Sequence, residues 1–103
     1  MQKVSLVKHR TADDALRALP EWLQNHSLVK SEKHFVYNCE AIGLAIRNRR
    51  LSAKMSLRSM ARWISVSPTY LSDLERGLRP WPLSRIEDAT NVLEMAERIE
   101  IKK

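Results

Sequence analysis

Apolar side chains recur every three or four positions along much of the chain, which is the spacing of a helix that buries one face. This spacing predicts helices over residues 32–51, 57–64 and 68–76, and a longer helix that begins near Pro82. The inward positions expected in the first of these helices are Phe35, Cys39, Ile42 and Ile46, and in the last they are Leu83, Ile86, Ala89, Thr90, Leu93 and either Ala96 or Glu97.

The N-terminal part of the chain has a mixed pattern. Residues 1–9 alternate loosely between apolar and polar side chains, which indicates either a short strand or an extended arm. Residues 12–19 follow the helical period, and Pro20 separates this helix from a further turn or two that ends near Asn25, because a proline ring clashes with the preceding helical turn. The remaining segments are predicted to be a polar connection over 27–34 and frayed helix or a short strand over 98–103.

The composition narrows the fold class. With 103 residues, 44% of them hydrophobic, the chain is long enough for one small core. Two glycines and four prolines provide few turn residues for an all-β fold, so an all-α domain is expected. No apolar stretch is long enough to span a membrane, and the N-terminus lacks the apolar core of a signal peptide. The single cysteine, Cys39, cannot form an internal disulfide, so a reducing cytoplasm is the expected compartment.

The positive charge is concentrated in one part of the chain. The formal net charge is +6, and nine of the 18 Lys and Arg side chains lie within residues 41–85, where the acidic ones are Asp73 and Glu75. Such a cluster indicates either binding to phosphate groups or another polyanion, or a solvated surface rich in arginine. The charge alone leaves both interpretations open.

This basic region carries local signals for two short helices joined by a tight turn. Ser56 precedes the first helix and Ser67 the second, and serine is favoured where a hydroxyl can accept a hydrogen bond from the helix N-terminus. Pro68 suits the first helical position and Gly77 suits a left-handed exit. With one helix before and another after, this pattern is typical of a helix-turn-helix arrangement.

Residues 42–93 resemble the phage-repressor (Cro and Xre-like) helix-turn-helix family. The resemblance rests on Ile46-Arg47 and Arg50 in the first helix, the Ser56 cap, the Met60-Ala61 pair, the Val66-Ser67 turn, Leu71, Leu74-Glu75-Arg76-Gly77, and then Leu83, Ile86, Ala89 and Leu93. It implies an all-α, lambda-repressor-like bundle of about five helices, with a small strand possible at either terminus. Residues 31–100 are then the DNA-binding domain, and 1–30 are an extension that is a candidate dimer or partner interface.

The resemblance also implies roles for the exposed side chains of helix 68–76. In the family, the N-terminal part of this helix lies in the major groove of DNA. The base-facing positions are carried over to Pro68, Thr69 and Asp73, with Tyr70 and Ser72 beside them. Thr69 can contact a thymine methyl, and Asp73 can accept from a cytosine amino group. Phosphate contacts are assigned to Ser56, Arg58, Ser67, Arg76, Arg79 and Arg85, with Arg47, Lys54 and Arg62 as second choices.

Some positions are interpreted as structural or depart from the family pattern. Arg50 and Glu75 fall where family members often form an ion pair between helices. Ser65 stands where the family usually has glycine, so either it tolerates a positive φ or the turn differs slightly from that of the family. Arg49 replaces an apolar residue, and Trp81 stands where proline is common. Trp63 and Trp81 are interpreted as core or dimer contacts rather than base-stacking platforms.

These features favour a non-enzymatic, sequence-specific regulator that binds double-stranded DNA. A repressor or autorepressor is expected, working as a cytoplasmic homodimer on a palindromic operator in a bacterial or phage-infected cell. The alternative is an antitoxin that binds a protein partner through residues 1–30 and regulates its own gene, or a phage-encoded inhibitor that uses the basic face to occupy a nucleic-acid site on its target. No cofactor or metal is expected, because His9, His26 and His34 are scattered and lack the spacing of metal ligands.

Overall fold

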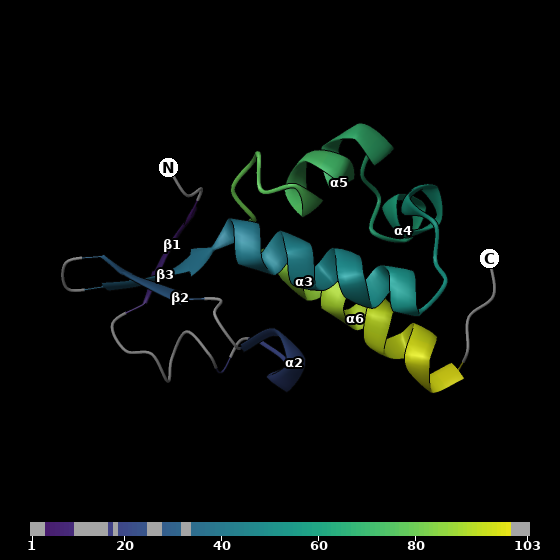
Figure 1. Cartoon of the computed structure of the whole chain (residues 1–103), viewed down its shortest axis with the longest axis horizontal. Helices are drawn as coiled ribbons and strands as arrows, with labels where there is room; N and C mark the ends of the chain where they lie inside the picture. The colour runs from purple at the N-terminus through teal and green to yellow at the C-terminus, as the bar shows by residue number, and fades with distance from the viewer. Residues whose placement is uncertain (1–3, 10–16, 18, 25–27, 32–33, 100–103) are drawn as a thin grey trace.

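The computed structural model describes residues 4–9, 17, 19–24, 28–31 and 34–99, which form an N-terminal sheet with a short helix and a bundle of longer helices (Figure 1). The elements in chain order are β1 (Val4–His9), α2 (Glu21–Gln24), β2 (Leu28–Ser31), β3 (His34–Asn38), α3 (Cys39–Ser52), α4 (Leu57–Trp63), α5 (Pro68–Glu75) and α6 (Leu83–Ile99).

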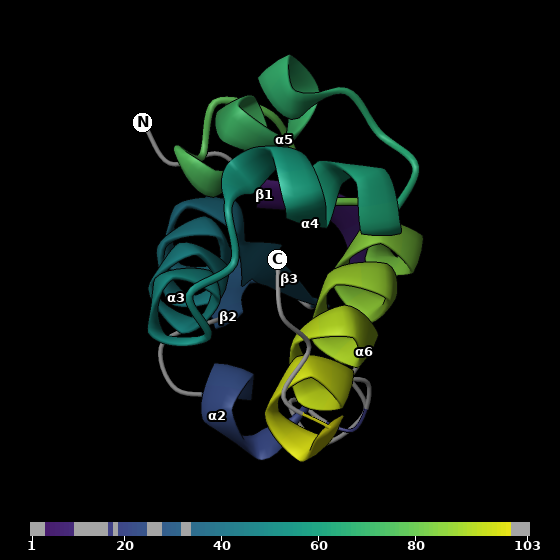
Figure 2. The same cartoon turned by 90° about the vertical axis from the view of Figure 1, so that its right-hand side faces the viewer.

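The two longest helices, α3 and α6, form the middle of the molecule. Figures 1 and 2 show α4 and α5 together on one side of this pair, and α2 on the opposite side. The sheet lies beyond the N-terminal end of α3, because β3 leads directly into that helix (Figure 1). The helix-turn-helix pair is therefore supported from beneath by α3 and α6.

The helices confirm the predicted helix-turn-helix bundle, and the three-stranded N-terminal sheet is an addition to the all-α fold that was expected. The observed bounds of α4 and α5 agree with the predicted helices over 57–64 and 68–76 to within one residue. α6 begins directly after Pro82, as expected, and buries Ile86, Ala89, Thr90, Leu93 and Ala96 of the predicted inner face. It extends through Ile99, and residues 100–103 lie outside the described part of the chain.

The sheet is antiparallel, with strand order β1-β3-β2. The strand predicted as one possibility over 1–9 is confirmed by β1, and the short turn after Pro20 by α2. The prediction of a polar connection over 27–34 is wrong, because Leu28–Ser31 forms strand β2, in which Leu28 lies opposite Tyr37 of β3. Most of the helix expected over 12–19 falls outside the described residues.

The start of the predicted helix over 32–51 is also wrong. Strand β3 occupies His34–Asn38, where it pairs with β1 on one side and β2 on the other. The helix begins only at Cys39, because Asn38 caps it: the Asn38 side-chain oxygen accepts a hydrogen bond of 3.1 Å from the Ala41 amide. Of the expected inward residues, Cys39, Ile42 and Ile46 are buried in α3, whereas Phe35 belongs to the strand.

Trp81 lies in the core, where it connects the loop after α5 to the N-terminal end of α3. It is fully buried, its indole Nε1 donates to the Leu74 carbonyl at 3.0 Å, and its amide donates to Cys39 Sγ at 3.1 Å. Trp81 is thus a core residue, one of the two roles left open by the sequence. Trp63, in contrast, is 49% exposed.

Arg49 attaches α2 to the bundle. Its guanidinium carbon lies 4.8 Å from the centre of the Trp22 ring, and its Nη2 lies 2.7 Å from Glu97 Oε2. These contacts give a physical reason for an arginine at a position that is usually apolar: Trp22 covers it from α2, and a carboxylate of α6 neutralises its charge. Among the described residues, no helix is both long and apolar enough to cross a bilayer.

Candidate nucleic-acid interface

The turn between α4 and α5 is tight, and particular residues determine its conformation. Met60 and Ala61 of α4 are buried, and the Val66 amide donates to the Ala61 carbonyl at 3.0 Å. Ser65 has φ = +60°, the conformation expected at the position where the family usually has glycine. The small side chain of Ala61 and the left-handed residue at the turn together let α5 cross α4 closely.

Both short helices are capped by the serines that the sequence indicates. Ser56 Oγ accepts from the Ser59 amide at 3.0 Å, and Ser67 Oγ accepts from the Tyr70 amide at 3.1 Å. Each capping hydroxyl accepts through its oxygen and retains its own hydrogen for a further acceptor. Both serines are exposed, so each offers a donor at a helix N-terminus, where an anion is favoured.

Gly77 ends α5 in a left-handed conformation. Its φ is +72°, and the Leu78 amide donates back to the Asp73 carbonyl at 2.9 Å. A Cβ at this position would lie 2.6 Å from Glu40 Cγ and 2.8 Å from Glu40 Cα. The turn therefore requires glycine for both its backbone angle and its space, and it directs the following residues back along α5.

A buried ion pair fixes α5 to α3. Arg50 donates through Nε to Glu75 Oε2 at 2.7 Å and through Nη2 to Glu75 Oε1 at 2.9 Å. Its Nη1 donates to the Met55 carbonyl at 2.9 Å, just ahead of α4. These two residues, assigned a structural role from the sequence, are brought together by the fold and connect α3, α5 and the segment leading into α4.

The outward face of α5 carries the residues predicted to face DNA bases. Leu71, Leu74 and Glu75 are buried, so the opposite side of the helix points away from the protein. Thr69, Asp73 and Arg76 are separated by four and three positions and share this outward face. The remaining members of the predicted set are Pro68, which is exposed, and Tyr70 and Ser72, which are partly buried on the two flanks.

Asp73 is held by an arginine from the loop that follows. Arg79 Nε lies 3.0 Å from Asp73 Oδ2, and the Arg79 guanidinium carbon lies 5.6 Å from the centre of the Tyr70 ring. From the sequence, Asp73 was assigned to bases and Arg79 to phosphates, and their contact was not predicted. The signal that could have indicated it is the chain reversal at Gly77, which brings position 79 back beside α5.

The other flank of α5 borders a small basic hollow. This hollow of about 220 Å³ is lined by Arg47, Arg50, Leu57, Ser72, Glu75 and Arg76. Arg50 and Glu75 neutralise each other inside it, so Arg47 and Arg76, both exposed, give the hollow its positive charge. Arg47, only a second choice from the sequence, thus lies with Arg76 at one hollow.

The other side chains predicted to contact phosphate differ in their exposure and in their hydrogen-bond partners within the protein. Arg58 is exposed in the first turn of α4, two positions after its Ser56 cap. Arg85 is partly buried: its Nη1 donates to the Ile64 carbonyl at 3.3 Å and to Asp88 Oδ2 at 3.2 Å. The second choices Arg62 and Lys54 are exposed. Arg85 thus has protein partners for part of its guanidinium, whereas Arg58 lies open at a helix start.

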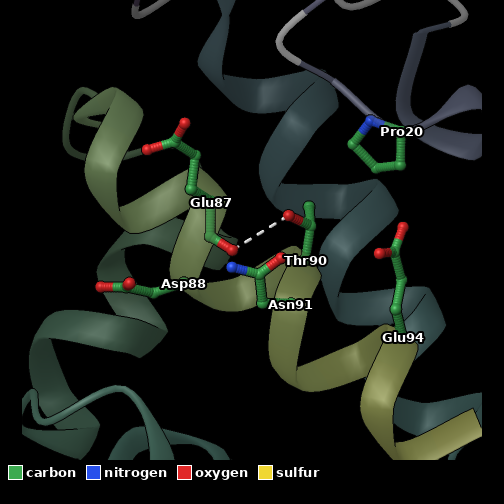
Figure 3. A pocket seen from close by; sticks show the side chains of 6 residues that line it. All are labelled: Pro20, Glu87, Asp88, Thr90, Asn91 and Glu94. Atoms are coloured by element: carbon green, nitrogen blue, oxygen red, sulfur yellow. Dashed lines mark hydrogen bonds between the residues drawn. The ribbon is translucent and has the colours of Figure 1, made fainter.

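An acidic hollow of about 490 Å³ lies along α6, and Arg85 borders it through its contact with Asp88. Figure 3 shows Glu87, Asn91 and Glu94 along α6, with Pro20 on the other side of the hollow. Thr90 in its wall donates to the Glu87 carbonyl at 3.1 Å, and Asp88 completes the lining. The carboxylates make this hollow repel phosphate, in contrast to the basic hollow beside α5.

The described residues contain no group of three or more His, Cys, Asp and Glu side chains placed to hold a metal ion. Burial raises the pKa of the Cys39 thiol, although a hydrogen bond from the Trp81 amide opposes the shift. Burial, and to a smaller extent the charge of Glu87, raise the pKa of the Tyr37 hydroxyl. Both groups therefore remain protonated near neutral pH and lie in the core rather than at the α4–α5 surface.

Comparison with known families identifies the class of this protein. The sequence profile described as "Helix-turn-helix domain" matches residues 41–100, which is more than half of the chain and covers α4, the turn and α5. The chain belongs to this helix-turn-helix family, whose domains bind DNA. Comparisons with curated proteins and with solved structures give no match.

Proposed function

We propose that this protein is a transcriptional regulator, a repressor or autorepressor, that places the N-terminal part of α5 in the major groove of its operator. The observation that carries the proposal is the arrangement around the outward face of α5. Thr69 lies on that face, and exposed arginines lie around it in α4, α5 and the following loop. The acidic hollow lies elsewhere, along α6 (Figure 3).

Within this proposal, phosphate contacts hold the protein on DNA and base contacts set its preference. Ser56, Ser67 and Arg58 contact the backbone at the two helix starts, and Arg76 and Arg47 contact it at the basic hollow. Thr69 and the adjoining side chains of α5 contact base edges. Because few side chains of α5 contact base edges, DNA shape contributes to the sequence preference as well.

The test is a titration of the protein onto its own upstream DNA and onto scrambled duplexes at several salt concentrations. A regulator prefers the upstream sequence and retains this preference as salt rises, whereas a nonspecific polyanion binder shows no such preference. Arg58→Ala and Arg76→Ala should lower the affinity for all DNA sequences similarly. Thr69→Ala should change the preference of the protein for one DNA sequence over another. Asn91→Ala, at an exposed position of α6 beside the acidic hollow, is the control and should change neither. Equal affinity for all duplexes would contradict the proposal.

We also propose that the protein binds as a homodimer, because two half-sites multiply the affinity of a small readout set. Residues 1–30 and the C-terminal tail are the candidate interface. Light scattering after size exclusion should give twice the chain mass of 12.0 kDa. A monomer at micromolar concentration would contradict the dimer.

A second candidate function is the binding of a protein partner by an antitoxin or inhibitor. It is favoured by the N-terminal sheet, which lies ahead of the residues that match the family. Strands β1 and β2 are the outer strands of the sheet, and outer strands can pair with another chain. Mixing the protein with the product of the neighbouring gene tests this candidate, since a stable complex would support it and separate elution would not.

A further inference from the structure

Arg79 lies in the loop after α5, in a position set by the turn at Gly77. The left-handed glycine and the hydrogen bond from the Leu78 amide to the Asp73 carbonyl reverse the chain. Arg79 therefore extends back over the side of α5 that carries Tyr70 and Asp73. A side chain from outside the helix thus supplements the few groups that α5 itself presents.

Two contacts fix the direction of the Arg79 guanidinium. Its Nε donates to Asp73 Oδ2 at 3.0 Å, and its guanidinium carbon lies over the Tyr70 ring, 5.6 Å from the ring centre. The Arg79 side chain remains 57% exposed, whereas that of Asp73 is 22% exposed. The contact uses Nε, so the edge formed by Nη1 and Nη2 keeps its donors for another partner.

The free edge of a fixed guanidinium matches guanine. The major-groove edge of guanine presents O6 and N7 as two adjacent acceptors, and two parallel N–H groups of an arginine can donate to both. We propose that Arg79 reads a guanine in each half-site, and that Asp73 and Tyr70 are positioning residues for it. This inference rests on the proposed placement of α5 in the major groove.

The carboxylate beside Arg79 favours a base over a phosphate as its partner. A phosphate brought to Arg79 would meet the negative charge of Asp73, whereas a guanine edge carries acceptors without a net charge. A bidentate contact to guanine also requires a fixed orientation of the guanidinium, which the contacts with Asp73 and Tyr70 provide. Asp73 consequently acts through Arg79 and does not itself accept from a cytosine.

The experiment is selection of binding sites from a random duplex pool with the wild-type protein and the variants Arg79→Lys, Asp73→Asn and Arg49→Lys. Lysine keeps the charge at position 79 but cannot form the bidentate contact. Arg79→Lys should lower the preference for one guanine per half-site by about 5- to 100-fold and leave the other positions unchanged. Asp73→Asn should lower the same preference in part. Arg49→Lys is the matched control and should keep every preference, because Arg49 also contacts a carboxylate, that of Glu97, and a ring, that of Trp22, but lies on the α2 side of the molecule.

Three results would overturn the inference. Arg79→Lys could weaken all sequences equally, which would make Arg79 a phosphate contact. Asp73→Asn could change the preference at a cytosine that Arg79→Lys leaves intact, which would make Asp73 a direct reader. The wild-type protein could enrich no sequence, which would overturn the proposed function as well. In the first two results the wild type still selects a site, so failure of this inference is distinguishable from failure of the proposed function.

Discussion

Arg50 of α3 and Glu75 of α5 form a two-pronged ion pair, with nitrogen–oxygen distances of 2.7 and 2.9 Å. Their side chains are only 8% and 3% exposed. The third donor of Arg50 binds the Met55 carbonyl, so one guanidinium connects three parts of the bundle. The direction of α5 relative to the rest of the domain depends on this contact, which is a structural requirement for any function of its outward face.

Removing one partner of this pair should destabilise the fold strongly. Arg50→Ala or Glu75→Ala leaves a buried charge without its partner, and we expect a loss of about 3–5 kcal/mol in the free energy of unfolding. The double variant Arg50→Met/Glu75→Leu removes both charges and should recover most of the loss. Urea unfolding measures each value. Single variants that lose less than about 1 kcal/mol would contradict a structural role for the pair.

Replacing Ser65 with glycine should stabilise the protein. At φ = +60° a Cβ is crowded, whereas glycine adopts this angle freely. Glycine also makes the unfolded chain more flexible, which offsets part of this gain. We therefore expect the free energy of unfolding to rise by about 0.5–1 kcal/mol, as measured by thermal or urea unfolding. Ser52→Gly in the last turn of α3 is the control and should destabilise. If Ser65→Gly also destabilises, the left-handed turn is not strained.

Gly43→Ala should destabilise the contact between α3 and α5. A Cβ at Gly43 would lie 2.6 Å from the Glu75 carbonyl oxygen and 2.9 Å from its carbon, and backbone atoms cannot move aside as a side chain can. We expect Gly43→Ala to lower the free energy of unfolding by about 1–3 kcal/mol. Asn48→Ala, at an exposed position of the same helix, should change stability little. Equal unfolding midpoints for the two variants would show that the helices can separate without cost.

Stability should fall at alkaline pH because of the Cys39 thiol. Burial raises its pKa above the usual value of 9.0, so the folded protein holds the proton more strongly than the unfolded chain. The contribution of the protonated thiol to the free energy of unfolding is fully present below pH 9. It is lost as the pH rises through the pKa that Cys39 has in the folded protein. The stability difference between the wild type and Cys39→Ser, measured with reductant present, should therefore shrink above pH 9. A difference that stays constant to pH 10 would contradict the shift.

Local chemistry was sufficient to predict the helix-turn-helix part from the sequence. Ser56 and Ser67 are capping residues next to apolar residues at helical spacing, so both helix starts could be located to one residue. The positive φ at Ser65 was one of two alternatives implied by the family resemblance, because glycine usually stands at this position of the turn. These features depend on neighbours within a few positions, which a sequence shows directly.

The sheet could not be predicted in the same way, because its stability depends on distant partners. Phe35 and Cys39 are four positions apart and fit a helical face, yet residues 34–38 form the central strand between β1 and β2. The signal for a strand was the run of Phe35, Val36 and Tyr37, which are residue types favoured in strands. The signal for the helix start was Asn38, a favoured capping residue.

The contact between Asp73 and Arg79 could not be predicted from helical spacing either. The two residues are six positions apart and on different elements, and only the reversal at Gly77 brings them together. The same holds for Arg49 and Trp22, which come from different helices. Side-chain partners across a turn or between helices require the path of the chain in three dimensions.

The placement of α5 in the major groove is the central claim, and methylation protection by dimethyl sulfate on the selected duplex tests it most directly. This reagent methylates guanine N7, which lies in the major groove, and adenine N3, which lies in the minor groove. The account predicts that the bound protein protects guanine N7 within each half-site and leaves adenine N3 reactive there. Protection of adenine N3 with guanine N7 still reactive would contradict it.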